Sequence, residues 1–424
     1  MPMPTVKTWW PWRWPTWLWL GGLTLALLIR FPIHFLLEPP YLMDFQVYHI
    51  VARRVVEGHA ALLYAPTTSE LMVFKYAPCW ALLWAPLAGV SDPVGAVLWS
   101  GLSVLCLSLT CLLAIRLCQR IGLSTPPWLC ALAALLVVRP LTAEFLNGQV
   151  DLLWGLLVVG YLVAEQARRP WWAATALALA VSLKLPALIF IAYGLMRRRW
   201  VDTARVLLVG IGLNVPSALL LDPAHPWRIF QAWAQVLWSS GSGRAFEIGN
   251  QSLAALLARL LSDDGYRLNL LALDETGVLI ATLGVFALLF GLVCVRPASE
   301  LDEPSRRVVD GALLTTLMVL CSPTVWIATY SALLFPAAAA VAALATPRRR
   351  RSGARLVERS TTGAIIILSL LTHGKVWKAL GVPAFRSESY VYLVFLILPW
   401  LALALFALLL GHRAAIAELH RSAL

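Results

Sequence analysis

Charged residues are scarce in this chain. Only 13% of its 424 residues are Asp, Glu, Lys or Arg, whereas 60% are hydrophobic. Because a soluble globular domain carries about 25% charged residues, this composition excludes a soluble protein. Apolar stretches of about 20 residues, the length that crosses a bilayer as a helix, recur from end to end. We therefore expect an all-α fold, a polytopic membrane helix bundle of roughly 10–12 segments, with residues 1–424 forming a single integral membrane domain.

The chain also lacks the sequence signatures of metal and nucleotide sites. It has no Asp-x-Asp pair, no Cys and His residues at metal-ligand spacing, no glycine loop for phosphates and no nucleophile elbow. Its seven cysteines lie in or near apolar runs, which favours small core residues over ligands or a disulfide framework. A soluble nucleotide-sugar transferase has no support in this pattern, and we expect no metal and no other cofactor.

Positive charge is abundant, but its distribution excludes a nucleic-acid partner. The net charge of +12 comes largely from short basic clusters between apolar runs. These clusters are Arg168-Arg169, Arg197 to Arg199, Arg306-Arg307 and Arg348 to Arg351. Basic loops of this kind mark the cytoplasmic side of membrane proteins, so the general partners we expect are membrane lipids. The Trp-rich residues 9–14 are typical of an interfacial anchor, with the amino terminus in the cytoplasm.

Two loops are long enough to hold helices outside the membrane. A first membrane helix at about residues 17–37 leads to an outer loop at 38–76. The apolar residues that follow Asp44 recur at helical spacing, with polar residues between them, which predicts an amphipathic helix on the membrane surface. A second outer loop at 222–250 contains a Trp-rich amphipathic segment. Counting the crossings places both loops on the same side of the membrane.

The membrane crossings between Arg116 and Arg199 can be threaded in two ways. If Arg116, Arg120, Arg168 and Arg169 are cytoplasmic, some of the short apolar runs must be half-crossing hairpins. If every run spans the membrane, those arginines face outward. Later runs are predicted near 277–295, 309–326, 329–345 and 390–411, with a weaker one at 361–372 and cytoplasmic linkers at 296–308 and 346–359.

Asp44 is the first residue that could carry chemistry. An aspartate just before a helix is a favoured N-cap, which accepts a backbone N–H and leaves one carboxylate oxygen free. A carboxylate held beside the membrane can also act as a general base on a hydroxyl. His49, five residues later, is a surface histidine or a catalytic one.

Lys184 is the second such residue. An ionised amine near the bilayer centre costs about 3 kcal/mol or more, so it requires a partner. Lys184 either snorkels or pairs with a carboxylate such as Asp151, or it contacts a lipid-linked phosphate, and Pro186 can open the helix there for a pocket. Asn147, Gln149 and Asp151 either join helices or bind substrate. Arg244 and Arg259 offer bidentate phosphate binding, or anchor loop ends at the headgroups.

These motifs, taken in order over about residues 17–345, resemble glycosyltransferase family 87, the polyprenyl-phosphate-mannose-dependent mannosyltransferases of bacterial membranes with the C-type glycosyltransferase fold. The matching pieces are Asp44 to Tyr48, Gly58 with Leu63-Tyr64, Phe74-Lys75-Tyr76-Ala77-Pro78 with Ala85 to Ala88, Asn147 to Asp151, Lys184 to Pro186, Asn250 to Leu253 with Arg259, and Ser322 to Trp326. Each piece alone is weak, whereas the ordered set is fairly specific.

The resemblance implies a catalytic role for Asp44. It would deprotonate the acceptor hydroxyl, and polyprenyl phosphate would leave with inversion, without a metal or nucleotide. Candidate substrate-binding residues are Tyr48, His49, Lys75, Tyr76, Asn147, Gln149, Lys184, Arg244, Asn250, Gln251 and Arg259. The family usually has a histidine where this chain has Ala328, and His373 could substitute for it.

The leading hypothesis is therefore a glycosyltransferase of the bacterial inner (plasma) membrane with its active site facing outward. It would move a hexose, predicted to be mannose, from a polyprenyl-phosphate-linked sugar donor to a lipid or glycan acceptor. A secondary transporter or lipid flippase is the alternative from another class, although the chain lacks the two matching halves common in transporters. Because the family usually has a histidine where this chain has Ala328, a third possibility is a scaffold protein without catalytic activity.

Overall fold

The structure is a computed structural model, and helices make up nearly all of its regular structure. It describes residues 42–69, 72–241, 244–247, 249–262, 270–295, 302–346, 352–372, 376 and 397–422. Within these ranges a lone β-bridge joins Ser262 to Leu273. The all-α prediction is therefore confirmed. The predicted first membrane helix at 17–37, the Trp-rich residues 9–14 and His373 lie outside the described residues.

Membrane-crossing length and composition are found in several helices of the described part. Four helices qualify, or five if a pair bent by 73° counts as one span. The four are α4 (Asp92–Arg120), α10 (Trp200–Leu221), α13 (Glu275–Val295) and the continuous η6 (Ile327–Leu333) and α15 (Leu334–Ala345). The bent pair is α5 (Leu129–Leu136) and α6 (Val138–Asn147). Many apolar side chains on α10 and α13 are exposed, as expected for helices in contact with lipid.

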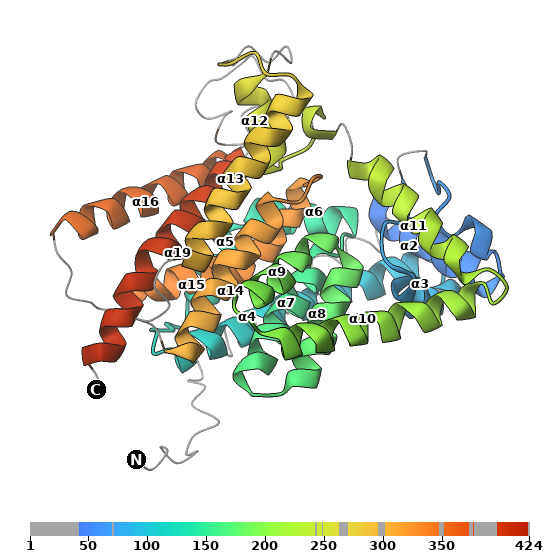
Figure 1. Cartoon of the computed structure of the whole chain (residues 1–424), viewed down its shortest axis with the longest axis horizontal. Helices are drawn as coiled ribbons and strands as arrows, with labels where there is room; N and C mark the ends of the chain where they lie inside the picture. Colours follow the sequence, from blue (N-terminus) through green and yellow to red (C-terminus); the bar gives the residue numbers. More distant parts are fainter. Residues whose placement is uncertain are drawn as a thin grey trace.

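Other helices complete the bundle between and around these spans (Figure 1). Two of them, α7 (Asp151–Gln166) and α14 (Glu303–Leu320), lie near its centre. The others are α8 (Pro170–Leu183), η3 (Leu185–Ala187), α9 (Leu188–Met196), α16 (Ser352–Leu371) and α19 (Ile397–Ser422). The core is contiguous, and residues 308–320 and 328–343 are almost entirely buried in it.

Arginine side chains join several helix ends at one end of the bundle, which we call the arginine end. Arg199, just before α10, pairs with Glu165 near the end of α7 (Nη1 to Oε2, 3.0 Å) and with Glu303 at the start of α14. Arg307 donates to the Glu165 carbonyl oxygen at 3.0 Å. The turns at 166–170 and 197–200 therefore lie beside the 302–307 segment. This arrangement matches the first threading, in which short runs form half-crossing hairpins.

The hairpin formed by α8 and α9 reverses at Lys184. α8 has 14 residues and α10 has 22, which correspond to about 21 Å and about 33 Å of helix at 1.5 Å per residue. Asn214 of α10 donates to the Ser182 hydroxyl at 2.8 Å, which fixes the hairpin tip against the middle of α10. Lys184 therefore lies about 10 Å from the level of the C-terminal end of α10, on the side toward the arginine end.

The opposite end, the Asp44 end, gathers helices from both predicted outer loops. It contains α2 (Met43–Val56), η1 (Ala60–Leu62), α3 (Pro78–Trp84), η2 (Ala85–Gly89) and α11 (Pro226–Gly241), with α2, α3 and α11 grouped at the right of Figure 1. Trp233 of α11 donates its indole N–H to the Lys75 carbonyl oxygen at 3.0 Å, so the two loops meet. η4 (Arg244–Phe246) and α12 (Leu253–Leu261) follow, and the label α12 lies at the top of Figure 1.

The first-loop helix differs from the helix predicted to lie on the membrane surface. α2 packs against α3, η2 and α4, and Phe45, Tyr48 and Ala52 are buried as the periodicity indicated. His49, expected on the polar face, is also buried, and its ring nitrogens contact the Val90 carbonyl oxygen, which follows η2, and the Asp92 carboxylate at the start of α4. Contacts on both faces therefore make α2 part of the bundle. The interpretation of His49 as a surface histidine is wrong.

Candidate functional site

Asp44 lies in the first turn of α2 and faces the turn between α6 and α7. Gln149 donates its side-chain N–H to Asp44 Oδ2 at 2.5 Å. The N-cap position of α2 is occupied by Leu42, without a side-chain cap bond, so the N-cap interpretation of Asp44 is wrong. One carboxylate oxygen is thus held by an amide from a segment 105 residues further along the chain.

Burial of Asp44 changes its acid–base behaviour. Desolvation raises the pKa of this carboxyl from 3.8 to about 6, although the positive charge of Lys184 opposes the shift. Asp151 raises the pKa further, and Lys75 lowers it. A carboxylate whose pKa lies near neutral pH accepts protons far better than an ordinary aspartate. These interactions also show that Asp44, Asp151, Lys184 and Lys75 share one electrostatic environment.

Gly148 lets the α6–α7 turn approach α2 closely enough for this contact. It has φ = +67°, a left-handed conformation that glycine adopts without strain. A Cβ atom at this position would lie 2.9 Å from Phe45 Cβ and 3.2 Å from Leu42 Cβ. Glycine is therefore required here both by the backbone angle and by the space. Asn147, predicted to bind substrate, is half-buried and ends α6 just before Gly148.

Lys184 occupies the tip of the α8–α9 hairpin. Its backbone is extended (φ = −146°, ψ = 122°), because Pro186 cannot continue α8. The ammonium forms an ion pair with Asp151 Oδ1 and lies 5.7 Å from the centre of the Trp154 ring. Asp151 is fully buried, and its Oδ2 has no hydrogen-bond partner among the described residues. The predicted Lys184–Asp151 pair is present, at the edge of the Asp44 environment.

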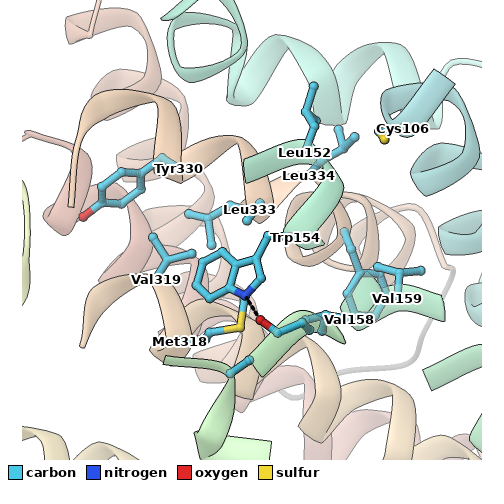
Figure 2. Packing of buried hydrophobic residues seen from close by; sticks show 14 of the residues in the cluster. Cys106, Leu152, Trp154, Val158, Val159, Met318, Val319, Tyr330, Leu333 and Leu334 are labelled. Atoms are coloured by element: carbon cyan, nitrogen blue, oxygen red, sulfur yellow. Dashed lines mark hydrogen bonds between the residues drawn. The ribbon is translucent and has the colours of Figure 1, made fainter. Parts of the chain in front are cut away.

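Trp154 anchors the floor of this region in the core. Figure 2 shows its indole among Leu333, Val319, Met318 and Val158. The indole N–H donates to the Ala180 carbonyl oxygen at 3.1 Å, one turn before Lys184 in α8. α7 is thereby fixed to α8, which holds Asp151 and Lys184 at a constant separation.

The Phe74 to Pro78 segment forms another wall of the site. Ala77 N–H donates to the Ser182 carbonyl oxygen at 2.9 Å, which places this segment beside the hairpin tip. The hydroxyl groups of Tyr76 and Tyr48 lie 3.0 Å apart, and burial raises the pKa of both well above the ordinary value. Both tyrosines therefore remain neutral hydrogen-bonding groups at physiological pH.

Glu144 is a buried carboxylate that sequence reasoning missed. It lies on α6 with no exposed surface, accepts the Leu152 backbone N–H at 3.0 Å and accepts the Ser331 hydroxyl at 3.1 Å. It thus fixes the start of α7 to η6. A signal was present in the sequence, since an acidic residue within an apolar run is a functional candidate by default.

A second group of predicted residues forms a clamp around the 323–325 segment. Asn250 accepts the backbone N–H groups of Val325 and Ser252, each at 3.0 Å, and donates to the Pro323 carbonyl oxygen at 2.8 Å. Arg259 is 2% exposed and donates to the carbonyl oxygens of Glu247 (3.1 Å) and Asn250 (3.4 Å). These contacts are to the protein backbone, so both side chains organise the segments that follow the second loop.

Gln251 belongs to this clamp through its backbone. Its N–H donates to the Val325 carbonyl oxygen at 2.7 Å, and its own carbonyl accepts the Tyr330 hydroxyl at 2.6 Å. The side-chain amide is fully buried, and neither of its polar atoms has a partner among the described residues. Ala328, which occupies the position of the family's usual histidine, is fully buried in η6 beside this clamp.

The remaining predicted residues are not brought to Asp44 by any described contact. His49 Nδ1 lies 2.6 Å from Asp92 Oδ1, and His49 Nε2 lies 3.0 Å from the Val90 carbonyl oxygen. The backbone of Arg244 begins η4, while its side chain lies outside what the structure describes. Within the described ranges, no group of three or more His, Cys, Asp or Glu side chains could hold a metal ion.

Sequence comparisons add an independent line of evidence. The family model described as "Glycosyltransferase family 87" matches residues 74–323, more than half of the chain. A Mycobacterium tuberculosis relative named polyprenol-phosphate-mannose-dependent alpha-(1-2)-phosphatidylinositol mannoside mannosyltransferase is 27% identical over 68% of this chain and 67% of its own length. A protein of the same name from Mycolicibacterium smegmatis is 28% identical over 62% of each chain.

No solved structure matches the chain. The family match sets aside the transporter and flippase alternative, and the apolar spans make the protein an integral membrane protein. Because the family model matches more than half of its length, this chain belongs to glycosyltransferase family 87.

Proposed function

We propose that this protein transfers mannose from a polyprenyl-phosphate-mannose donor to a hydroxyl group of a lipid-linked glycan at the outer face of the membrane. The names of both relatives supply the donor class and indicate a glycolipid acceptor. The observation that carries the proposal is the convergence of Asp44, with its raised pKa, and Lys184 in the half of the bundle away from the arginine end.

In the proposed reaction, Asp44 is the general base. The acceptor oxygen attacks the anomeric carbon of mannose, the bond from that carbon to the phosphate oxygen breaks, and polyprenyl phosphate leaves with both bonding electrons. The acceptor proton passes to Asp44, and the single displacement inverts the anomeric configuration. The Gln149 contact to Oδ2 orients the carboxylate, so that its other oxygen can face the hydroxyl.

Lys184 is the proposed phosphate contact. The leaving group gains negative charge as the bond breaks, and a cation in a buried site stabilises that charge strongly. Lys184 is 22% exposed at its side chain, whereas its partner Asp151 is fully buried, so the ammonium is the member of the pair that a ligand can reach. Lys75, which also acts electrostatically on Asp44, is a second proposed contact. Tyr48, Tyr76 and Gln149 would contact the sugar.

Replacing Asp44 by asparagine tests this assignment. The substitution keeps the side-chain shape but removes the base, so we expect the rate of transfer from synthetic polyprenyl-phosphate-mannose in detergent to fall by about 100- to 10,000-fold. Glu57→Gln is the matched control, because Glu57 follows α2 and its side chain is 56% exposed. A wild-type rate for Asp44→Asn would refute the base, and an inactive wild-type protein would support the inactive scaffold suggested by Ala328.

A further inference from the structure

An apolar groove opens beside the candidate site on the surface of α3, η2 and α4. Its volume is about 250 Å³. It is lined by Trp80, Leu83, Trp84, Pro86, Leu87, Leu98, Trp99, Leu102 and Leu153. No charged side chain contributes to this lining. Three indole rings give it flat, rigid walls, and Leu98 and Leu102 stand one turn apart on α4 at its open side.

The groove is continuous with the residues that hold Lys184. Trp80 donates its indole N–H to the Leu179 carbonyl oxygen in α8 at 3.3 Å, little more than one turn before Lys184. Trp99 donates to the Gln149 carbonyl oxygen at 3.3 Å, in the turn that contacts Asp44. Leu153 follows Asp151, the partner of Lys184, by two residues on α7. The side chains on the inner side of the groove therefore contact the same segments that hold Lys184 and Gln149 in the candidate site.

The position of the groove indicates that it opens to lipid and not to water. α4 is a candidate membrane span, and Leu98 and Leu102 lie about 9 and 15 Å along it from Asp92. Leu98 is 54% exposed and Leu83 is 55% exposed, although both are apolar. Exposed apolar side chains of this kind mark a surface that contacts a hydrocarbon chain.

We propose that this groove binds the first isoprene units of the donor's polyprenyl chain. The inference rests on the proposed function, because it concerns the lipid attached to the phosphate that Lys184 would hold. The chain that enters beside Lys184 is the one joined to the leaving phosphate, whereas the acceptor brings its hydroxyl group to Asp44. The groove thereby aligns the anomeric carbon with the base, and it selects polyprenyl-linked donors over short-chain phosphates.

The test fills the groove and measures chain-length selectivity. Leu98→Trp and Leu102→Trp place an indole at its open side, and Leu105→Trp is the control on the same helix, because Leu105 is 52% exposed but does not line the groove. We expect wild type and Leu105→Trp to use a long-chain polyprenyl-phosphate-mannose at least about tenfold better, by kcat/KM, than methyl-phosphate-mannose, a short donor that has no isoprene unit to occupy the groove. The groove variants should lose that preference and retain their rate with the short donor.

Several outcomes would overturn the groove assignment. One is an unchanged preference for the long chain in both groove variants. Another is a change in the dependence on acyl-chain length of the acceptor, which would assign the groove to the acceptor lipid. If the variants lose activity with both donors, the assignment is tested by photo-cross-linking. The probe is a long-chain polyprenyl phosphate that carries a photoreactive group on its first isoprene units. Cross-links to α3 or α4 residues of the groove support the assignment, and cross-links confined to other helices refute it.

These experiments distinguish failure of the groove from failure of the proposed function. If wild type transfers no mannose from either donor, the function is wrong, while the cross-linking still reports where the polyprenyl chain binds. If wild type transfers mannose but its groove variants behave as wild type, the function stands and the groove assignment falls.

Discussion

At the scale of single residues, the proposed chemistry depends on how desolvation sets the protonation of Asp44. Its pKa is raised to about 6 because desolvation disfavours the carboxylate. As a base it must be ionised, so we expect kcat/KM to be constant above this pKa and to fall about tenfold per pH unit below it. Lys75 lowers this pKa, so Lys75→Met should move the midpoint of the profile to higher pH.

The measurement is the pH dependence of kcat/KM in wild type and Lys75→Met. Arg53→Gln is the control, because Arg53 lies on α2 and pairs with Asp92, away from the Asp44 carboxylate. A profile that stays flat from pH 5 to 8 would contradict the role of Asp44 as the titrating base.

The same raised pKa has the opposite effect on folding. Because the folded state holds the proton more tightly than the unfolded state, the stability contributed by Asp44 is fully present below its ordinary pKa of 3.8 and is lost as pH rises through about 6. Asp44→Asn should therefore unfold at a higher temperature than wild type at pH 7.5, although we expect it to lose transfer activity. This combination separates a catalytic loss from a folding loss, and thermal unfolding in detergent measures it.

The Lys184–Asp151 pair can be dissected with a double-mutant cycle. Lys184→Met leaves the fully buried Asp151 without its cation, which should destabilise the protein by about 3–5 kcal/mol. Lys184→Met combined with Asp151→Asn should recover most of that stability, because no buried charge remains. Transfer should remain low in the double mutant if Lys184 binds the phosphate. Recovery of both stability and transfer would reduce the lysine to a structural role.

At the scale of structural elements, the turn between α6 and α7 is the piece that builds the site. Gly148→Ala places a methyl group 2.9 Å from Phe45 Cβ, so this turn must move away from α2 and separate Gln149 from Asp44. Gly122→Ala is the matched control, because Gly122 has φ = +72° and nothing within 4 Å of its added Cβ.

Both substitutions should cost about 1–2 kcal/mol of stability for the left-handed backbone, and Gly148→Ala should cost more because of the clash. Only Gly148→Ala should also lose transfer activity. Thermal unfolding and the donor assay together measure the two effects. Equal activity losses in both variants would place the effect in the backbone conformation and not in the Gln149–Asp44 contact.

At the scale of the whole molecule, the proposal requires the two ends of the bundle to lie on opposite sides of the membrane. We expect a cysteine at Ser91 or His225, near the Asp44 end, to react with a membrane-impermeant thiol reagent added outside intact cells. A cysteine at Arg168 should react only after the membrane is permeabilised, because the proposal places the arginine end on the cytoplasmic side. The parent chain is a suitable background, since five of its seven free cysteines are buried and two are partly buried.

Labelling of Arg168→Cys from outside intact cells would reverse the predicted orientation. Labelling of all three positions from one side would contradict the hairpin threading in which α8 and α9 turn back at Lys184. The test is independent of activity, so it also applies to a variant that transfers no sugar.

The sequence by itself determined the all-α membrane class, the family and the segments that carry polar groups among apolar runs. These properties follow from composition and from local order along the chain: low charge, helical periodicity and an ordered set of short motifs. The sequence could also name Asp151 as a partner for Lys184, because a buried ammonium requires a nearby carboxylate.

Only the tertiary structure decided which polar groups meet. The contact of Gln149 with Asp44 joins residues 105 positions apart, and Gly148 makes it possible by its conformation and its lack of a side chain. Asn250 and Arg259 bind backbone carbonyls, a role that their identity does not reveal. The groove beside Trp80 and Trp99 also exists only in the folded chain. Each of these features depends on packing between distant helices, which local sequence patterns do not encode.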